Sequence, residues 1–307
     1  MPGLPAGAAA LRVCRVTCVK PDRVLVTGAS GQLGAVIVNA FADSEVVAHT
    51  RASLDVTDAA AVRRAVAAAA PQVIVNCAAY NDVDGAEGSP LTALGVNAFA
   101  VRTLARAAAE TGAMLVHYST DFVFDGTARE PYGEDVPPAP RSTYAASKLL
   151  GEWFALEAPG SFVLRVESLF GAPRGWSGRR GTLDGLVAAI EGGREVKVFT
   201  DRVVSPTYTS DVAAATRHLI AVDAAPGLYH CVNAGYGSWY DVAREAAGIL
   251  GVTPRFVTVT TDQVPMKAAR PRFCALNPAR LAAAGFPMPP WTNALRRWLA
   301  GRGVPAT

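Results

Sequence analysis

The sequence is poor in cysteine, in long apolar runs and in excess charge. Its 307 residues include five cysteines, an odd number with no CxxC pair, which argues against a disulfide framework and against a zinc site. No apolar run reaches the roughly 18 to 20 residues that span a bilayer. The net charge is +3, and basic residues are scattered among acidic ones without the basic stripe of a nucleic-acid-binding surface. We therefore expect a cytoplasmic protein that holds no metal and binds neither membranes nor nucleic acid.

The first segment, residues 1–20, does not have basic residues before an apolar stretch, as a secretory signal does. Met1–Ala10 is small and apolar, and basic residues follow it instead of preceding it. We expect residues 1–20 to be a disordered extension, or the result of a start codon assigned too far upstream. The rest of the chain, in a sequence that is 50% hydrophobic, is long enough for one large α/β domain or two closely joined ones.

Residues 21–170 alternate short apolar runs with helix-forming runs. The expected strands are 23–27, 45–48, 73–77, 114–119 and 161–165, and the expected helices are 35–42, a run from Ala59, 96–111 and 144–156. This alternation predicts an α/β fold with a doubly wound parallel (Rossmann) sheet.

The regular alternation of apolar and helix-forming runs becomes weaker over residues 171–307, where prolines are more frequent. We expect a smaller C-terminal substrate-binding lobe there, with some segments returning to the main sheet. Within it the expected strands are 196–199 and 228–232, and the expected helices are 211–221, 239–250 and 292–300.

A glycine turn connects the first expected strand with the first helix. It reads GxxGxxG through Gly28, Gly31 and Gly34. The first glycine permits a tight turn, the second lets backbone approach a pyrophosphate, and the third lets the helix pack on the strand. The motif predicts a dinucleotide site; the alternative is a glycine-rich turn without a ligand.

The end of the second strand indicates which dinucleotide is preferred. An acid that would bond the ribose of NAD is missing there, and Arg51 could pair with a 2′-phosphate. We expect NADPH, with NADH as the alternative cofactor and a solvated charge as the alternative role of Arg51. Asp55 resembles an acid on the adenine side of such a site, and Asp58 is expected to cap the following helix.

Tyr144 and Lys148 stand four residues apart in a helix-forming run and therefore share one helical face. A nearby ammonium group favours the phenolate and should lower the tyrosine pKa, so the pair could give a proton to a reacting oxygen. Taken alone, this spacing is also that of a solvated surface pair. Thr120 follows an apolar strand, where its hydroxyl could bond a substrate carbonyl or simply form a turn.

These motifs together resemble the dTDP-4-dehydrorhamnose reductase family, which consists of extended short-chain dehydrogenase/reductases. The resemblance covers residues 23–300. Its matching passages are GASGQLG, LDVTD, VIVNCAAYNDVDGAE, Val96-Asn97, YSTDFVFDG, PYGED, YAASKLLGE, SPTYTSDVA and Arg270-Pro271.

The resemblance implies a reductase that transfers hydride from nicotinamide to the ketone of a nucleotide-linked 4-keto-6-deoxysugar. It makes Thr120, Tyr144 and Lys148 the catalytic set, with Tyr144 as proton donor. The implied cofactor residues are Gly28, Gly31, Gln32, Leu33, Gly34, Asp55, Val56, Ala78, Ala79, Tyr144 and Lys148, to which Arg51 is added. The implied substrate residues are Asp82, Val83, Asp84, Thr120, Asp121, Phe122, Arg202 and Arg270.

The chain departs from the family pattern at three places. Arg165 is followed by Val166-Glu167-Ser168, which lacks the tryptophan that the family often has there. Arg202 replaces the neutral amide of the usual DQxGxPT segment. Val36 stands where some members have a glutamate that helps to bind magnesium at a dimer interface, so we do not expect metal-dependent dimerisation, although the sequence leaves a homodimer open.

Two alternatives remain at this point. A nucleotide-sugar epimerase or dehydratase is the first; such dehydratases tend to carry a glutamate directly after the aspartate of their Thr-Asp segment, where this chain has Phe122. The second is a regulatory subunit that resembles the β-subunit of methionine adenosyltransferase. The presence of Thr120, Tyr144 and Lys148 together favours the reductase.

Overall fold

The computed structural model describes residues 20–173, 175–178 and 181–302. The predicted extension at residues 1–20 lies, except for Lys20, outside the described residues.

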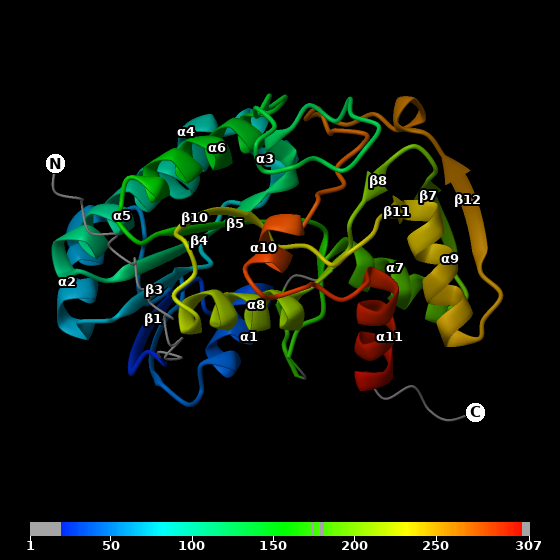
Figure 1. The fold of residues 1–307 in the computed structure, drawn as a ribbon. Coiled ribbons are helices and arrows are strands. Elements are labelled where there is room, and N and C mark those ends of the chain that lie inside the picture. The colour runs from blue at the N-terminus through cyan, green and yellow to red at the C-terminus, as the bar shows by residue number, and fades with distance from the viewer. Residues whose placement is uncertain (1–19, 174, 179–180, 303–307) are drawn as a thin grey trace, which may run out of the picture.

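Six parallel strands form the main sheet, in the order β10-β5-β4-β3-β1-β2 (Figure 1). Their bounds are β1 Arg23–Thr27, β2 Glu45–His49, β3 Val73–Asn76, β4 Met114–Thr120, β5 Phe162–Val166 and β10 Gly227–His230. The strand order reverses between β1 and β3, and such a switch point opens a crevice at the carboxyl ends of the strands. The predicted doubly wound parallel sheet is confirmed, and the expected strand at 228–232 forms its edge as β10.

Helices cover both faces of this sheet (Figure 1). One face carries α2 (Ala59–Ala69), α5 (Ala100–Thr111) and α6 (Thr143–Leu156), and the other carries α1 (Gln32–Ala40) and α8 (Thr209–Ala221). Because successive side chains of a strand point to opposite faces, Leu25 joins the core under α2 and α5. Its neighbours Val24 and Val26 join the core under α1 and α8. Apolar runs buried on both faces are typical of strands in a parallel sheet.

The local sequence explains where two of these helices begin. Asp58 accepts hydrogen bonds from the backbone of Ala60 and Ala61, so its predicted capping role for α2 is confirmed. α1 begins at Gln32, three residues before the predicted start at Ala35, because the glycine turn itself forms the first turn of the helix.

The expected helix at 96–111 is part of a longer, bent segment. It runs through α3 (Val83–Gly88), α4 (Pro90–Leu94), a π-helical turn (Gly95–Phe99) and α5. The π turn lies against α6, where a Cβ on Gly151 would be 2.1 Å from the carbonyl oxygen of Asn97. Only glycine permits this close approach between the two helices.

The C-terminal segments build a second layer, seen at the right of Figure 1. It contains the parallel pair β7 (Glu195–Phe199) and β12 (Arg255–Val259), with the helices α7 (Thr182–Glu191), α9 (Trp239–Leu250) and α11 (Trp291–Gly301). The short elements are β6 (Leu169–Phe170) with β9 (Thr207–Tyr208), β8 (Val203–Val204) with β11 (Gly237–Ser238), α10 (Ala279–Ala283), and the 3₁₀ turns Asp121–Val123 and Thr261–Gln263. A separate apolar core joins α7, α9 and α11 with β6, β7 and β8, whereas Leu281 of α10 belongs to the core under α1 and α8. α9 and α11 agree with the predicted helices, whereas α7 and β12 were not predicted.

None of the helices within the described residues has the length and apolar character needed to cross a membrane.

Candidate active site

A pocket of about 510 Å³ lies at the carboxyl ends of the strands, between the main sheet and the C-terminal layer. It brings together most of the residues that were singled out from the sequence. Those that line it are Gly31, Gln32, Leu33, Gly34, Ala78, Ala79, Asp82, Val83, Asp84, Thr120, Asp121, Phe122, Tyr144, Lys148, Arg202 and Arg270.

Four predicted cofactor residues do not line this pocket. Arg51 is exposed two residues after β2, and Asp55 accepts hydrogen bonds from the backbone and hydroxyl of Thr57 at 2.9 and 2.7 Å. Val56 follows in the same loop, and Gly28 is the first residue of the glycine turn, packed against the backbone of Cys77 and Ala78. The turn is tied to this loop region, because the backbone N–H of Ala29 donates to the carbonyl of His49. A role for Arg51, Asp55 and Val56 therefore requires a ligand that extends past the pocket.

The glycine turn is shaped by contacts that exclude side chains. Gly28 has φ +67°, and a Cβ there would lie 2.6 Å from the backbone nitrogen of Ala78. A Cβ on Gly34 would lie 2.2 Å from the carbonyl oxygen of Gly28. Gly31 occupies the N-cap position of α1, so no side chain caps the helix, and its first turn contains no acidic residue. The backbone N–H groups at the start of α1, which no helical carbonyl accepts, therefore lie at the pocket and can bind an anion.

The N-terminal end of α6 holds Tyr144 and Lys148 in the pocket wall. The backbone and hydroxyl of Thr143 donate to the carboxylate of Glu87 at 2.8 and 3.0 Å, which fixes the start of the helix. Only 9% of Tyr144 and 3% of Lys148 is exposed. The Lys148 ammonium donates to the carbonyl oxygen of Tyr118 at 2.5 Å, at the end of β4. Lys148 is therefore placed by the sheet, while Tyr144 packs against Ala86, Ala93 and Phe122.

The electrostatics of this pair differ from the sequence-based expectation. Burial lowers the pKa of Lys148 to about 8. The pKa of Tyr144 is raised, first by burial and then by the negative charge of Asp121, while the Thr120 hydroxyl opposes the rise. The expected lowering of the tyrosine pKa is thus wrong for the protein alone, because desolvation of the phenolate is the largest influence on it. The phenol keeps its proton at neutral pH.

Thr120 ends β4 beside Tyr144. Its hydroxyl donates to the carboxylate of Asp121 at 3.0 Å and accepts the backbone N–H of Phe122 at 3.2 Å. The Phe122 ring meets the Tyr144 ring edge-on, with centroids 5.9 Å apart. The predicted catalytic set Thr120, Tyr144 and Lys148 is therefore gathered in one pocket, whereas its roles in catalysis stay predictions.

Two predicted substrate residues bond each other across the mouth of the pocket. The Arg270 guanidinium donates to both carboxylate oxygens of Asp84, at 2.9 and 2.7 Å. This pairing lowers the pKa of Asp84 to about 2, and Asp84 also accepts the backbone N–H of Ala268. The ion pair fastens α3 to the segment after β12, so the C-terminal layer is held over the pocket.

Several buried polar residues around the site were given no role from the sequence. Asn97 bonds the backbone N–H and carbonyl of Tyr80 and the hydroxyl of Ser147, so it joins the loop after β3 to α6. Glu152 and Arg165 form a buried ion pair behind Lys148. The signal for Asn97 was its place in a matching passage, but its buried partners lie far from it in the sequence.

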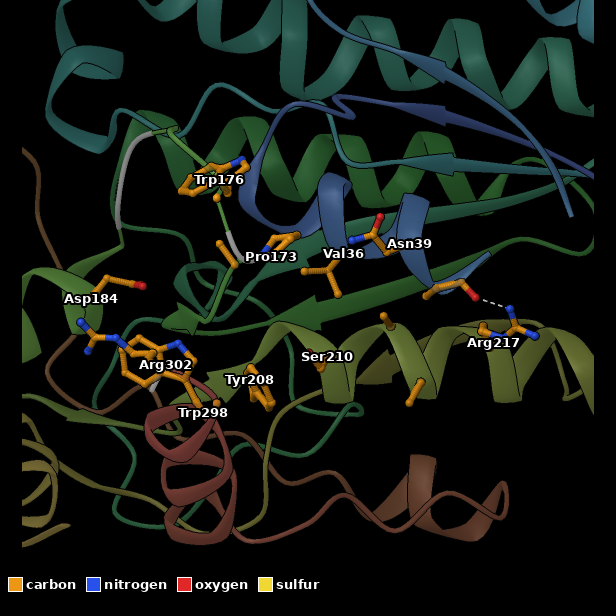
Figure 2. A pocket seen from close by; sticks show the side chains of 16 residues that line it. Val36, Asn39, Pro173, Trp176, Asp184, Tyr208, Ser210, Arg217, Trp298 and Arg302 are labelled. Atoms are coloured by element: carbon orange, nitrogen blue, oxygen red, sulfur yellow. Dashed lines mark hydrogen bonds between the residues drawn. The ribbon is translucent and has the colours of Figure 1, made fainter. Parts of the chain in front are cut away.

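A second and larger hollow, about 820 Å³, contains none of the predicted site residues. Figure 2 shows it between α1, α8 and α11, with Trp176 and Pro173 at its rim. Val36 lines it, so the position at which the resemblance places a magnesium-associated glutamate is apolar here. The chemistry-bearing side chains belong to the smaller pocket.

Comparisons with known proteins give the family. A family described as RmlD substrate binding domain matches residues 22–302. The chain belongs to the dTDP-4-dehydrorhamnose reductase family. It is 38% identical to a dTDP-4-dehydrorhamnose reductase of Streptomyces griseus, over 92% of this chain and 97% of the relative. It is 40% identical to a probable dTDP-4,6-dihydroxy-2-methyloxan-3-one 4-ketoreductase of Streptomyces antibioticus, over 89% and 93%.

A solved family structure has the same fold along nearly its whole length. The dTDP-4-dehydrorhamnose reductase of Bacillus anthracis, in complex with NADP, superposes with a TM-score of 0.86 at 32% identity and covers 91% of this chain and 99% of that protein. The family resemblance inferred from the motifs is confirmed.

Proposed function

We propose that this protein is an NADPH-dependent reductase of a nucleotide-linked 4-keto-6-deoxysugar. The observation that carries the proposal is the pocket in which Tyr144, Lys148 and Thr120 face the N-terminus of α1. Relatives named as reductases of such sugars, and a family structure that contains NADP, support the same activity. The residues that hold the substrate and the cofactor are part of the proposal.

The residues present fit a nicotinamide dinucleotide. The uncapped N-terminus of α1 offers N–H groups to a pyrophosphate, and the turn leaves no room for side chains that would block it. When bound, NADPH supplies the hydride that reaches the ketone carbon. Gly31, Gln32, Leu33 and Gly34 would hold its phosphates, while Lys148 would hold the nicotinamide ribose.

Tyr144 is suited to the reducing direction. As the ketone carbon is reduced, its oxygen becomes basic and takes the phenolic proton. A raised tyrosine pKa keeps that proton in place until the oxygen needs it. The Lys148 ammonium, next to the pocket, favours the phenolate that remains, and Thr120 is placed to bond the ketone oxygen.

Turnover with a panel of nucleotide-linked 4-ketosugars tests the proposal. We expect NADPH to be consumed only when one of these sugars is present, with formation of the corresponding hydroxyl at C4. Consumption should be absent with the same sugars lacking the keto group. No consumption with any member of the panel would contradict the proposed reductase.

Arg51→Ala is expected to weaken binding of NADPH about tenfold or more while leaving binding of NADH nearly unchanged, because only NADPH carries the 2′-phosphate that a guanidinium can bond. Dissociation constants measured by cofactor fluorescence check this. Arg64→Ala, which removes an exposed arginine of α2, is the matched control. Equal losses for both cofactors would remove the role of Arg51 in cofactor choice.

A further inference from the structure

The first turn of α6 carries Tyr144 and needs partners from outside the helix. The first four backbone N–H groups of any helix have no carbonyl partner within it. Ser142 at the N-cap accepts the N–H of Ala145 at 3.2 Å, and the first turn itself contains no acidic residue. The position of the Tyr144 phenol therefore depends in part on what other elements bond to this turn.

Glu87 bonds the residue directly before Tyr144. One of its carboxylate oxygens accepts the backbone N–H of Thr143 at 2.8 Å, and the other accepts the Thr143 hydroxyl at 3.0 Å. Thr143 is the first residue of α6, whereas Glu87 belongs to α3. A carboxylate at this end of a helix is also favoured by the helix dipole. Glu87 is half-buried and does not line the pocket, so any effect on the reaction passes through the helix that it holds.

α3 also packs against the side chain of Tyr144. Ala86, the residue before Glu87, is fully buried and forms an apolar cluster with Tyr144 and Ala93, and Phe122 packs against this cluster. Adjacent residues of α3 thus contact the ring of Tyr144 and hold the backbone before it. Both contacts place the same phenol.

α3 is itself fixed at its other side. A helix of six residues is not stable by its own hydrogen bonds. Asp82 caps it by accepting the backbone N–H of Gly85 at 2.9 Å, and Asp84 accepts two hydrogen bonds from Arg270, at 2.9 and 2.7 Å. The helix is therefore held between the C-terminal layer and α6, which gives the Glu87 carboxylate a fixed position.

We propose that Glu87 is a positioning residue for the proton donor: through Thr143 it holds the first turn of α6, and with it the Tyr144 phenol, in place at the ketone oxygen. This inference rests on the proposed reductase function. Glu87 gives up no proton, because the O–H bond that breaks is that of Tyr144 and the one that forms is on the product hydroxyl. Its contribution is to the distance and direction of this transfer, on which catalysis by a positioned acid depends.

Glu87→Ala removes both bonds to Thr143. We expect the single-turnover rate constant of ketosugar reduction to fall about tenfold to 10²-fold, the loss that a displacement of a reacting group by up to about 1 Å causes. The KM of the ketosugar and the Kd of NADPH should stay within about twofold, because Glu87 lies outside the pocket. A single-turnover rate constant does not depend on the fraction of protein that is folded, so lost stability alone would not lower it.

Glu110→Ala is the matched control for this variant, since it removes an exposed glutamate near the end of α5. Its single-turnover rate constant should equal that of the unmodified protein. An unchanged rate constant in Glu87→Ala would overturn the proposal.

Glu87→Gln separates the position of the helix from the charge of the carboxylate. The amide oxygen can accept the N–H of Thr143, and the amide nitrogen can donate to the Thr143 hydroxyl, so both contacts can persist without the charge. We expect a rate constant within about threefold of the original, because neutral hydrogen bonds hold the same geometry more weakly. A loss as large as that of Glu87→Ala would show that the charge matters and not the two bonds, and would overturn the positioning role.

Thr143→Pro keeps the test available if Glu87→Ala does not fold. Proline suits the first position of a helix, and Ser142 has the extended backbone that a residue before proline requires, with φ −145° and ψ 160°. This variant removes both donors to Glu87 and should reproduce the loss seen in Glu87→Ala. Where both variants fold, their combination should cause no further loss, because each removes the same contact. An unchanged rate constant in Thr143→Pro, or additive losses, would contradict the proposal.

Amide hydrogen exchange gives a readout that does not need turnover. In Glu87→Ala, exchange in the first turn of α6, residues 143–146, should become about tenfold faster or more, because a hydrogen bond to a charged acceptor is lost. The first turn of α2, which Asp58 caps, should be unaffected. If exchange rises as expected while the unmodified protein reduces no ketosugar, Glu87 holds the helix and the proposed function fails. Unchanged exchange over residues 143–146 would show that Glu87 does not hold this turn and would overturn the inference.

Discussion

Tyr144→Phe is expected to lower kcat by about 10² to 10⁴-fold, the usual contribution of a positioned general acid. The Tyr144 phenol lines the pocket and keeps its proton at neutral pH, and phenylalanine has nearly the same volume without that proton. Binding of NADPH should be retained, because the ring does not support the glycine turn. Single-turnover oxidation of NADPH, followed with a reactive nucleotide ketosugar, measures the chemical step directly.

Tyr240→Phe provides the control for this variant. Tyr240 is a half-buried tyrosine of α9 that packs edge-on against Phe256, with centroids 5.9 Å apart, and lies outside the pocket. Its loss should leave kcat close to the original value. A Tyr144→Phe protein with unchanged turnover would show that another group protonates the ketone oxygen.

Arg165→Met is expected to destabilise the protein by about 3 to 5 kcal/mol, because it leaves a buried carboxylate without its partner. Arg165 donates to both oxygens of Glu152 at 2.8 and 2.7 Å, and the exposed fractions of the two side chains are 2% and 3%. Glu152 also accepts the hydroxyl of Ser119 at 2.5 Å. The pair joins α6 to β4 and β5 beneath Lys148, so the midpoint of urea unfolding should fall steeply.

Two further variants separate the buried charge from lost packing. Arg165→Met combined with Glu152→Gln removes both charges and should recover part of the loss. Arg296→Met breaks the more exposed ion pair with Glu245, whose N–O distance is 3.5 Å, and should cost less than about 1 kcal/mol. Equal losses for Arg165→Met and Arg296→Met would mean that the buried pair has no special importance.

The features that the sequence predicted well depend on neighbouring residues. The strand, glycine turn and helix from Arg23 onward are encoded within a short segment, and so is the shared face of Tyr144 and Lys148. The parallel sheet followed from the alternation of such local segments. These predictions required only the geometry of residues that lie a few positions apart in the sequence.

The features that were missed depend on residues that are distant in the chain. β12 pairs with Glu195–Phe199, a segment far from it in the sequence, and this pairing was not predicted although the Phe, Val and Thr residues of Arg255–Val259 favour a strand. Glu167 was noticed only as a departure from the family pattern, since its neighbours Asp121 and Cys274 are brought to it by the fold. The pKa of Tyr144 was predicted in the wrong direction because a helical spacing says nothing about burial.

The position of β10 at the edge of the main sheet means that the sheet can be completed only late in synthesis. β10 pairs with β5, yet Gly227–His230 is synthesised long after Phe162–Val166. Until then the growing chain presents β5 as an open edge, which can pair with strands of other chains. A chain that ends between β5 and β10 would keep that edge exposed, so aggregation of incomplete chains, more than instability of the finished protein, is the hazard that this topology carries.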